Sequence, residues 1–520
     1  MLDKIEKLHP NEDINLMAHI TVDGTVLEVK EGALLIEELL AHKINIPHFC
    51  YHPALGKDGN CRMCMVEIEG QKRPQIACDT PIKDQMIVRT KGANIDRVKR
   101  SILELELINH PIDCPICDQA GECSLQNYYM DVGLYESRLS TPKVRGEKHV
   151  DLGANVVLDQ ERCVLCTRCV RFTKHITKTN ELGVLSRADH SVITTFPGLK
   201  LSNPYAMNVV DLCPVGALTS KDFRFQKRVW FLNTKEAICN HCARGCSIFV
   251  DHHKEKYKNE MIYRYRPRFN EAINGYFICD EGRLSYAQEN ENQEFSALIR
   301  GKMSEYEYAE GKLSRLLKRH LRKTLFLIAS ELSLEEMVRV QKLSKLQENT
   351  LNAYEPERFD ASFGDDFLKC NDRSANARAL PLLGIDTTKE GLEIALAQAE
   401  LVVLIGRSDA KMLKEMGYTG NVVILCSSCE VTCKEVELVL PIASHTRREG
   451  SFINVDGYVQ YSACAIACAH GQKPLLSLLA PIFGDTLFTC KEVWEAELFF
   501  YDVLKGIAFE SLKTTPKITL

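Results

Sequence analysis

No stretch of the sequence is apolar for long enough to cross a bilayer as a helix. The longest apolar run, Leu475 to Phe488, contains Gly484 and Asp485 and falls short of the roughly 20 residues that a span requires. The stretch from Met1 to Leu16 is charged and lacks the apolar core of a signal peptide. We therefore expect a cytoplasmic chain that meets a membrane only through partner proteins.

The sequence also lacks a strong charge and recognisable catalytic motifs. Its formal net charge is only −5 over 520 residues, which argues against nucleic acid as the main partner. No G-x-G-x-x-G follows any of the strands expected below, so a nicotinamide or flavin site is not expected on this chain. No Ser-His-Asp arrangement or pair of catalytic carboxylates is identified. We expect no substrate-converting site of its own.

Cysteine, in contrast, is abundant. Of the 22 cysteines, 15 lie in four groups between Cys50 and Cys279, and seven are scattered from Cys370 to Cys490. Disulfides are rare in the cytoplasm, so cysteines grouped at short spacings indicate metal chemistry. At roughly 150 residues per domain, the length predicts several domains.

The chain begins with the pattern of a small β-grasp ferredoxin. Residues His19 to Val22 and Thr25 to Val29 alternate in polarity on either side of Asp23-Gly24, which predicts a hairpin. Residues Ala33 to Lys43 have the periodicity of an amphipathic helix. Strand, turn, strand and helix in this order are typical of the start of that fold.

The first cysteine group follows this pattern. It has the spacing C-x10-C-x2-C-x13-C, and glycines at 56 and 59 allow the backbone to fold closely around a compact core. Four thiolates on one looping segment and one distal residue suit a 2Fe-2S cluster. The alternative is a four-cysteine structural zinc site. The candidate ligands are Cys50, Cys61, Cys64 and Cys78.

The second group combines a histidine with three cysteines. His110 precedes Cys114, Cys117 and Cys123 in the spacing H-x3-C-x2-C-x5-C, and Ser101 to Asn109 has the pattern of a helix that delivers the histidine. Iron accepts imidazole as well as thiolate, and no fourth cysteine is free nearby. We therefore expect a 4Fe-4S cluster with histidine as one ligand, against the alternative that His110 is a bystander.

The third group has the C-x2-C-x2-C spacing of a bacterial ferredoxin in Cys163, Cys166 and Cys169, with a distant Cys213-Pro214. In two-cluster ferredoxins the last cysteine of one motif binds the other cluster. The four surviving cysteines thus predict one complete 4Fe-4S site, with a zinc or degenerate segment as the alternative. The second site is lost, because its positions are occupied by Thr173, Asn203, Ala206 and Val209.

The fourth group is spaced C-x2-C-x3-C-x32-C. Three nearby thiolates and one remote thiolate suit another 4Fe-4S cluster, and zinc is the alternative. Its candidate ligands are Cys239, Cys242, Cys246 and Cys279.

Two strings carry a family resemblance. Residues 46–70 (IPHFCYHPALGKDGNCRMCMVEIEG) and 110–126 (HPIDCPICDQAGECSLQ) resemble the G-subunit family of bacterial NADH-quinone oxidoreductase, respiratory complex I, and the resemblance covers about Ala18 to Tyr286. It implies a peripheral-arm iron–sulfur protein that relays single electrons from a flavin-bearing, NADH-side partner to a quinone-side iron–sulfur partner. Such a protein lies at the cytoplasmic face of the inner membrane.

Related N-terminal regions occur in NAD-linked formate dehydrogenases, in diaphorase-type hydrogenases and in iron-only hydrogenases. An electron-transfer subunit of an NAD-linked hydrogenase or formate dehydrogenase is therefore the alternative function.

The fourth group also resembles the first segment of molybdopterin oxidoreductases, in which a lysine often follows the last cysteine by two residues. Here that position is Glu281. In the complex I family the matching cluster lies off the main electron route.

The back half has the pattern of an open α/β layer. Thr324 to Ser330, Leu401 to Ile405 and Val422 to Leu425 read as buried strands, and Leu332 to about Lys345 reads as a helix. Residues 438–460 resemble the E-G-x-x-x-N stretch of molybdopterin oxidoreductases, here Glu449, Gly450 and Asn454. The region is much shorter than a molybdenum domain. The resemblance implies a truncated, non-catalytic remnant without molybdenum.

The expected fold class is thus α+β followed by α/β. The predicted domains are a β-grasp 2Fe-2S ferredoxin-like domain (18–95), a His/Cys-ligated 4Fe-4S domain (96–140), a ferredoxin-like 4Fe-4S domain with one cluster lost (141–232), a molybdopterin-oxidoreductase-type 4Fe-4S domain (233–295) and a truncated α/β domain (296–520). The charge runs Arg97 to Arg100 and Lys143 to Lys148 are expected to be solvated faces, with docking strips for acidic partner surfaces as the alternative. The cofactors expected are one 2Fe-2S and three 4Fe-4S clusters.

A fifth cluster is chemically possible. Cys426, Cys429 and Cys433 repeat the C-x2-C-x3-C spacing and follow a predicted strand, whose C-terminal end is a common place for ligands. The alternative is that these cysteines are small buried apolar residues. Candidates for the fourth ligand are Cys464, Cys468 and Cys490, the first two lying one turn apart if their segment is helical.

Overall fold

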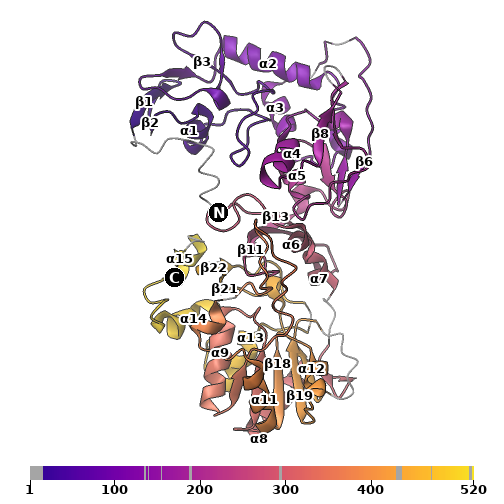
Figure 1. The fold of residues 1–520 in the computed structure, drawn as a ribbon, viewed down its shortest axis with the longest axis vertical. Helices are drawn as coiled ribbons and strands as arrows, with labels where there is room; N and C mark the ends of the chain where they lie inside the picture. The colour runs from indigo at the N-terminus through magenta and orange to yellow at the C-terminus, as the bar shows by residue number, and fades with distance from the viewer. Residues whose placement is uncertain are drawn as a thin grey trace. The chain divides into compact units, whose positions relative to one another are not determined.

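The computed structural model of the chain describes residues 16–133, 136–138, 140–153, 155–186, 190–291, 296–376, 378–428, 436–469, 471–514 and 518–519. The chain divides into two compact units, residues 1–231 and 232–520. In Figure 1 the first unit runs from indigo to magenta and the second runs on to yellow. Each unit is described by itself.

The first unit opens with the expected hairpin. Strands β1 (Met17–Val22) and β2 (Thr25–Lys30) pair antiparallel. The turn places Asp23 and Gly24 at φ values of 50° and 88°, which favour Asp or Asn and Gly. The predicted helix is present but shorter, as α1 (Leu35–Ala41), with Leu35, Ile36 and Leu39 buried.

A five-stranded sheet follows from this start, in the order β2-β1-β5-β3-β4. Strand β5 (Ile87–Arg89) runs parallel to β1, and β3 (Met65–Ile68) pairs antiparallel with β5 and with β4 (Gln75–Ile76). Helix α1 packs on the core of this sheet. The long connection between α1 and β3 carries the first three cysteines of the first group.

The rest of the first unit consists of short elements joined by loops that carry the cysteines. Helix α2 (Ala93–Leu107) starts eight residues earlier than the sequence pattern predicts and ends before His110. The remaining elements are α3 (Ser124–Val132), β6 (Val150–Gly153), β7 (Val156–Leu158), α4 (Arg168–Arg171), β8 (Leu182–Leu185), β9 (Val192–Thr195), α5 (Asn208–Leu212) and β10 (Leu218–Ser220).

The second unit begins with a three-stranded antiparallel sheet. It contains β11 (Asn233–Ile238), β12 (Ser247–Lys254) and β13 (Glu260–Pro267), followed by α6 (Asp280–Leu284) and α7 (Tyr286–Glu291). The fourth cysteine group lies at the end of this sheet where β11 passes into β12.

A seven-stranded sheet in the order β15-β14-β20-β19-β18-β16-β17 forms the centre of the second unit. Five of its strands are parallel, which confirms the predicted α/β layer: β16 (Thr324–Ile328), β17 (Thr350–Asn352), β18 (Leu401–Ile405), β19 (Asn421–Cys426) and β20 (Leu438–Pro441). The antiparallel edge consists of β14 (Leu298–Ile299) and β15 (Lys302–Met303).

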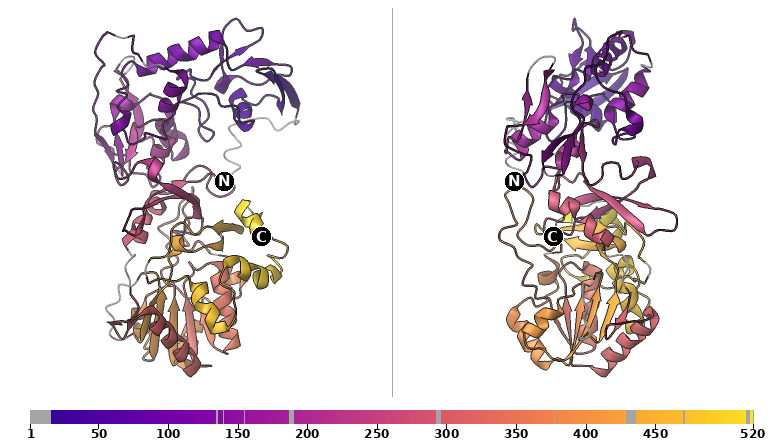
Figure 2. Two further views of the ribbon diagram at one scale, coloured as in Figure 1. Left: turned by 180° about the vertical axis from the view of Figure 1, so that it is seen from behind. Right: turned by 90° about the vertical axis from the view of Figure 1, so that its right-hand side faces the viewer.

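Helices cover both faces of this sheet (Figures 1 and 2). On one face lie α8 (Tyr306–Arg319), α9 (Leu334–Leu346), α13 (Leu475–Phe483) and α14 (Cys490–Ala496), and on the other α11 (Lys389–Gln398) and α12 (Ala410–Glu415). All five residues of β16 and of β18 are buried, as expected for parallel strands covered on both sides.

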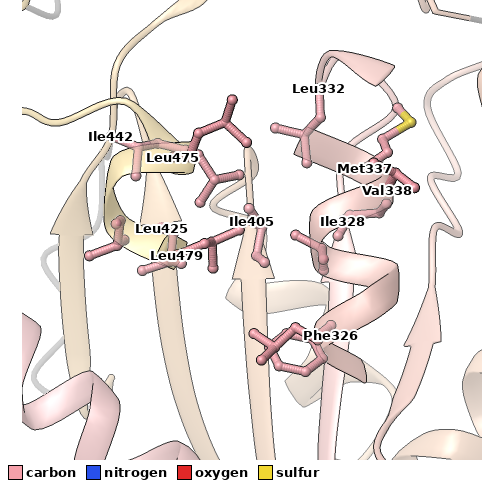
Figure 3. Close-up of a cluster of buried hydrophobic side chains, with 14 of the residues drawn as sticks. Phe326, Ile328, Leu332, Met337, Val338, Ile405, Leu425, Ile442, Leu475 and Leu479 are labelled. Atoms are coloured by element: carbon pink, nitrogen blue, oxygen red, sulfur yellow. The ribbon is translucent and has the colours of Figure 1, made fainter. Parts of the chain in front are cut away.

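Figure 3 shows the larger core of the second unit. Leucine, isoleucine and phenylalanine side chains from β16, β18 and β19 point at α9 and α13. Helix α9 starts with a capping box in which Ser333 and Glu336 bond each other's backbone N–H groups. This cap fixes the start of the helix two residues after the predicted position.

The last described elements are α10 (Ala379–Leu382), α15 (Phe509–Thr514) and a small sheet of β21 (Gly450–Ile453), β22 (Tyr458–Ser462) and β23 (Ile518–Thr519). Within the described part of the chain, no helix combines the length and the apolar character that crossing a bilayer would take.

Candidate metal centres

The four cysteines of the first group converge on one buried point. Their exposed fractions are 0%, 6%, 1% and 0% for Cys50, Cys61, Cys64 and Cys78. The thiol of Cys50 lies within hydrogen-bonding reach of Cys61 and Cys78, and the thiol of Cys64 lies within reach of Cys78. None of the four forms a disulfide. Such a set of close, buried thiols fits a thiolate-ligated cluster.

Two glycine turns and the hydrogen bonds between the thiols determine the loop geometry and the thiol pKa values of this group. Residues Gly56 and Gly59 have φ values of 68° and 74°, which allow the sharp turns that return the loop to Cys61. Hydrogen bonds from neighbouring thiols hold the pKa of Cys50 far below its usual range, while the same contacts raise the pKa of Cys78. The group therefore favours negative charge on part of its sulfur atoms.

The four residues of the second group line a single pocket, which they share with Asp113, Ala120 and Gly216 among others. The Nδ1 atom of His110 is buried and has no hydrogen-bond partner within the described residues. Burial lowers the pKa of His110 to about 4, so its imidazole is neutral at pH 7. A neutral, unpartnered ring beside three buried or partly buried thiols fits a metal ligand.

Lys143 fixes the backbone that carries His110. Its ammonium group donates hydrogen bonds to the carbonyl oxygens of Leu107, at 2.7 Å, and of His110, at 2.7 Å. These carbonyls lie at and just beyond the C-terminal end of α2, where a cation is favourable. Residues 144–149 are exposed, as expected for a solvated face, and only the half-buried Lys143, which caps a helix, departs from that expectation.

Gly216 shows how tightly the second group is packed. A Cβ atom at this position would lie 2.3 Å from the Sγ atom of Cys117 and 3.1 Å from the Cβ atom of Gln119. Only a glycine fits here without displacing the thiol.

We expect Gly216→Ala to push the Cys117 thiol out of place, because no side chain tolerates a 2.3 Å contact. The protein should lose up to about four irons per chain, the content of one 4Fe-4S cluster. Iron analysis and paramagnetic resonance check this. Gly183→Ala is the matched control, because its new Cβ would have ordinary contacts of 3.7 Å to Phe196. Equal iron in both variants would contradict the assignment.

The third group also lines one pocket, with Cys163, Cys166, Cys169 and Cys213 among its residues. Cys169 lies in α4, and Cys213 directly follows α5. Leu165 and Thr167 have φ values of 49° and 59°, so the loop between the first three cysteines is tightly wound. Burial raises the pKa of Cys213, whose sulfur accepts hydrogen bonds from backbone N–H groups of residues 215, 217 and 218.

The positions of the lost second ferredoxin site are filled. Thr173, Ala206 and Val209 are fully buried, and Asn203 is 7% exposed. The hydroxyl of Thr173 donates to the carbonyl oxygen of Val170 at 3.0 Å, and the side chain of Asn203 bonds Glu181. Apolar packing and hydrogen bonds thus occupy the region where a second set of ligands would be needed.

Loops of the third group contact both other groups of this unit. The Thr167 hydroxyl donates to Asp58 at 2.8 Å, and the Asn60 amide donates to the carbonyl oxygen of Leu165 at 2.9 Å. On the other side, the N–H of Ser124 donates to the carbonyl oxygen of Pro214 at 2.9 Å. The loops of the third group therefore contact the segments of both other groups of this unit.

The fourth group lies in the second unit and is also buried, with exposed fractions from 5% to 7%. The N–H of Cys239 donates to the carbonyl oxygen of Cys246 at 2.8 Å, and Cys279 caps α6 by accepting from the N–H of Gly282 at 3.3 Å. A Cβ atom at Gly282 would lie 3.0 Å from the Cys239 sulfur. Burial raises the pKa of Cys279 to about 12.

Two neighbours of this group were not found from the sequence. Cys370 places its thiol within hydrogen-bonding reach of Cys242, and this contact lowers the pKa of Cys242 to about 6. Lys369 pairs with Glu281 at 3.2 Å. A lysine charge therefore does lie near the position two residues after Cys279, although it comes from another segment. No spacing rule connects residues more than eighty positions apart.

The cysteines outside the four ligand groups lie in different surroundings. Cys429 and Cys433 lie outside the described residues. Cys426 ends β19 and packs in the apolar core on the α11 and α12 side of the sheet, whereas Cys490 packs in the core on the opposite side. Residues 463–469 are not helical, so the condition under which Cys464 and Cys468 would lie one helical turn apart is not met. Among the residues that the structure describes, no three His, Cys, Asp or Glu side chains are arranged to hold a single metal ion.

Three families of known domains match the first unit in succession. A 2Fe-2S iron–sulfur cluster binding domain matches residues 16–93. The NADH-ubiquinone oxidoreductase-G iron–sulfur binding region matches residues 99–138. The ferredoxin-like domain of NADH-quinone oxidoreductase subunit 3 matches residues 153–219. The first unit thus consists of 2Fe-2S and 4Fe-4S ferredoxin-like domains of mixed α and β structure.

Curated relatives of the chain are named as subunits of NADH-quinone or NADH-ubiquinone oxidoreductase. The chain is 37% identical over 286 residues to the G subunit of NADH-quinone oxidoreductase from Streptomyces coelicolor, covering 54% of this chain and 33% of the relative. It is 33% identical over 395 residues to the G subunit from Rickettsia felis, covering 75% and 55%. It is 39% identical over 270 residues to the NADH-ubiquinone oxidoreductase 75 kDa subunit of Reclinomonas americana, covering 52% and 38%.

The chain thus spans between about a third and about half of the length of these relatives. Among solved structures, a chain of an NAD+-reducing [NiFe]-hydrogenase is 28% identical, with a TM-score of 0.34, covering 41% of this chain and 91% of that chain. Within residues 16–219 the chain thus matches, in succession, a 2Fe-2S cluster binding domain and two iron–sulfur regions of NADH-ubiquinone and NADH-quinone oxidoreductases, and it is similar to G subunits of NADH-quinone oxidoreductase over about half of its length.

Proposed function

We propose that this chain is the iron–sulfur electron-transfer subunit of the peripheral arm of a bacterial complex I. It receives single electrons from a flavin-bearing, NADH-side partner and passes them towards quinone through a quinone-side iron–sulfur partner. The observation that carries this proposal is the interlocking of three buried ligand groups in one compact unit. The first of their domains also matches a 2Fe-2S cluster binding domain, and the next two match iron–sulfur families of NADH-ubiquinone and NADH-quinone oxidoreductases.

The proposed ligands are the four groups of side chains described above. One 2Fe-2S cluster is assigned to the first group and one 4Fe-4S cluster to each of the other three. Bound clusters supply one-electron chemistry that protein side chains lack. The chain's own residues supply the thiolates, the neutral imidazole of His110, the backbone N–H groups around Cys213 and the exclusion of water. Hydrogen bonds to sulfur and low exposure are the features by which a protein sets a cluster's potential.

We assign five domains within the two units: 18–95, 96–140, 141–232, 233–295 and 296–520. The last is a truncated relative of molybdopterin oxidoreductases without molybdenum. Its proposed task is to cover the fourth group. The supporting contacts come from the segment around the E-G-x-x-x-N motif: Asn454 donates to the carbonyl oxygen of Arg244 at 3.2 Å, and Gln460 donates to that of Gly245 at 2.8 Å.

The proposed location is the cytoplasmic face of the inner membrane, with attachment only through other proteins of the complex. Nucleic acid is not a partner in this proposal. The sequence alternative, an electron-transfer subunit of an NAD-linked hydrogenase or formate dehydrogenase, differs in the proteins with which the chain assembles. Identifying the proteins that purify with the native chain separates the two: NADH-side and quinone-side complex I proteins support the proposal, and a hydrogenase or formate dehydrogenase contradicts it.

Metal analysis tests the cluster assignment. One 2Fe-2S and three 4Fe-4S clusters give about 14 irons per chain, with molybdenum absent. A fifth cluster that included Cys426, Cys429 and Cys433 would raise the content to about 18. The measurement should be made on the full chain after anaerobic purification, with acid-labile sulfide counted alongside iron. Zinc in place of iron would overturn the proposal.

A further inference from the structure

Two buried arginines join the loops of the first and the third ligand groups. Arg168 and Arg171 lie in α4 and are 9% and 8% exposed. Arg168 donates to the carbonyl oxygen of Tyr51 at 2.5 Å and to that of Leu212 at 3.2 Å. One of these acceptors follows a ligand of the first group, and the other precedes a ligand of the third.

Arg171, one turn further along α4, binds the loop of the first group and the loop that precedes α4 in the third group. Its guanidinium donates to the carbonyl oxygens of Leu55 at 3.1 Å and Gly56 at 2.9 Å, and also to that of Cys50. A weaker bond of 3.5 Å reaches the carbonyl oxygen of Cys166. The planar guanidinium presents several donors in a fixed fork, so one side chain fixes several points of the first loop against α4.

These arginines lack the partner that buried arginines usually have. Within the described part of the chain, neither forms an ion pair with a carboxylate, and the Nε atom of Arg168 is buried without any hydrogen-bond partner. Arg162, in the same unit and 4% exposed, does pair with Asp113 at 2.6 Å. Carbonyl dipoles alone compensate a buried positive charge poorly, which suggests that an anion belongs nearby.

We propose that Arg168 and Arg171 are positioning residues that clamp the first and third cluster loops together and supply two fixed positive charges between the two clusters. This inference rests on the proposed function, because it assigns the missing negative charge to thiolate-ligated clusters. Reduction of such a cluster adds one electron and one negative charge without a proton. Fixed positive charges in a medium of low dielectric constant therefore favour the reduced forms and raise both potentials.

The test is made in the full chain. It compares variants that lose the positive charge with variants that keep the charge but lose the planar, multi-donor guanidinium group. Arg168→Gln and Arg171→Gln remove the charge and retain most of the length, whereas Arg168→Lys and Arg171→Lys keep the charge and lose the fork. Arg73→Gln, an exposed arginine of the same unit, controls for charge loss alone. Iron and sulfide are counted first, and each cluster is then titrated by paramagnetic resonance against potential.

The Gln variants should retain their clusters and shift the first and third potentials downward. We expect at least a tenfold change in the reduction equilibrium, which is 59 mV for a one-electron couple. The Lys variants should keep most of the wild-type potential, and Arg73→Gln should be unchanged. The cluster at His110 serves as the internal reference.

Unchanged potentials in Gln variants that retain both clusters would overturn the inference. If the Gln variants do not assemble, the Lys variants decide: retained potentials support the charge, and a fall of tenfold or more in the reduction equilibrium overturns it. A wild-type chain without iron or sulfide would instead refute the proposed function, so the two failures are distinguishable.

Discussion

Replacing Cys213 with alanine is expected to remove one 4Fe-4S signal, to leave the other clusters in place and to abolish electron flow to quinone. Iron should fall from about 14 to about 10 per chain, since one cluster holds four irons. Electron flow should stop because the loops around this group contact those of both other groups in the unit.

The expectation depends on where Cys213 lies. It is 44 residues from Cys169 along the chain, yet both line the same pocket. Three backbone N–H groups that follow Cys213 donate to its sulfur, so the segment is shaped around this atom. Alanine would keep the backbone and remove only the ligand, and among the described residues the cysteines that line this pocket are the four of the third group.

Paramagnetic resonance of the reduced protein measures the signals, and NADH-driven quinone reduction by the assembled complex measures the flow. Cys464→Ala is a suitable control, because Cys464 is exposed and its thiol donates only to the carbonyl oxygen of Ile466. An unchanged set of signals in Cys213→Ala would show that another residue completes the third group.

Features that depend on nearby residues could be predicted from the sequence. The Asp23-Gly24 hairpin follows from local turn preferences, and the strands β16 and β18 follow from short, continuous apolar runs. The grouping of the cysteines was also recognisable, because cluster chemistry imposes short spacings between cysteines. Even the distant Cys213 was placed with Cys163, Cys166 and Cys169, whose pocket it lines, while their ligation of iron stays a prediction.

Features that depend on tertiary packing could not be predicted. Arg168 contacts Tyr51 across 117 positions, and Cys370 contacts Cys242 across 128, so no local pattern indicates either pair. The run Arg97 to Arg100 was expected to be solvated throughout, but Lys99 is 9% exposed and donates to the carbonyl oxygen of Thr90 at 2.7 Å. A basic residue within a charge run gives no sign of which neighbour accepts its hydrogen bonds.

The second large effect is expected at His110. His110→Ala should weaken or remove the cluster of the second group, because alanine offers no ligand atom and the pocket would keep only three thiols among its described residues. The native ring is well prepared for this role: burial keeps it neutral, its Nδ1 atom has no other partner in the described residues, and Lys143 holds its carbonyl oxygen. The expected loss is about four irons per chain.

His110→Cys separates ligation from packing. A thiolate can replace the imidazole as a ligand, but its negative charge disfavours the additional electron, so the cluster should remain and its potential should fall. Redox titration followed by paramagnetic resonance measures this shift, and the exposed His149 of the same unit provides the control in His149→Ala. If His110→Ala retained the signal at its original potential, the ligand would have to be another residue. A fall in potential for cysteine together with a loss of iron for alanine would be explained only by iron bound to His110, because a packing role would not distinguish a charged ligand from a neutral one.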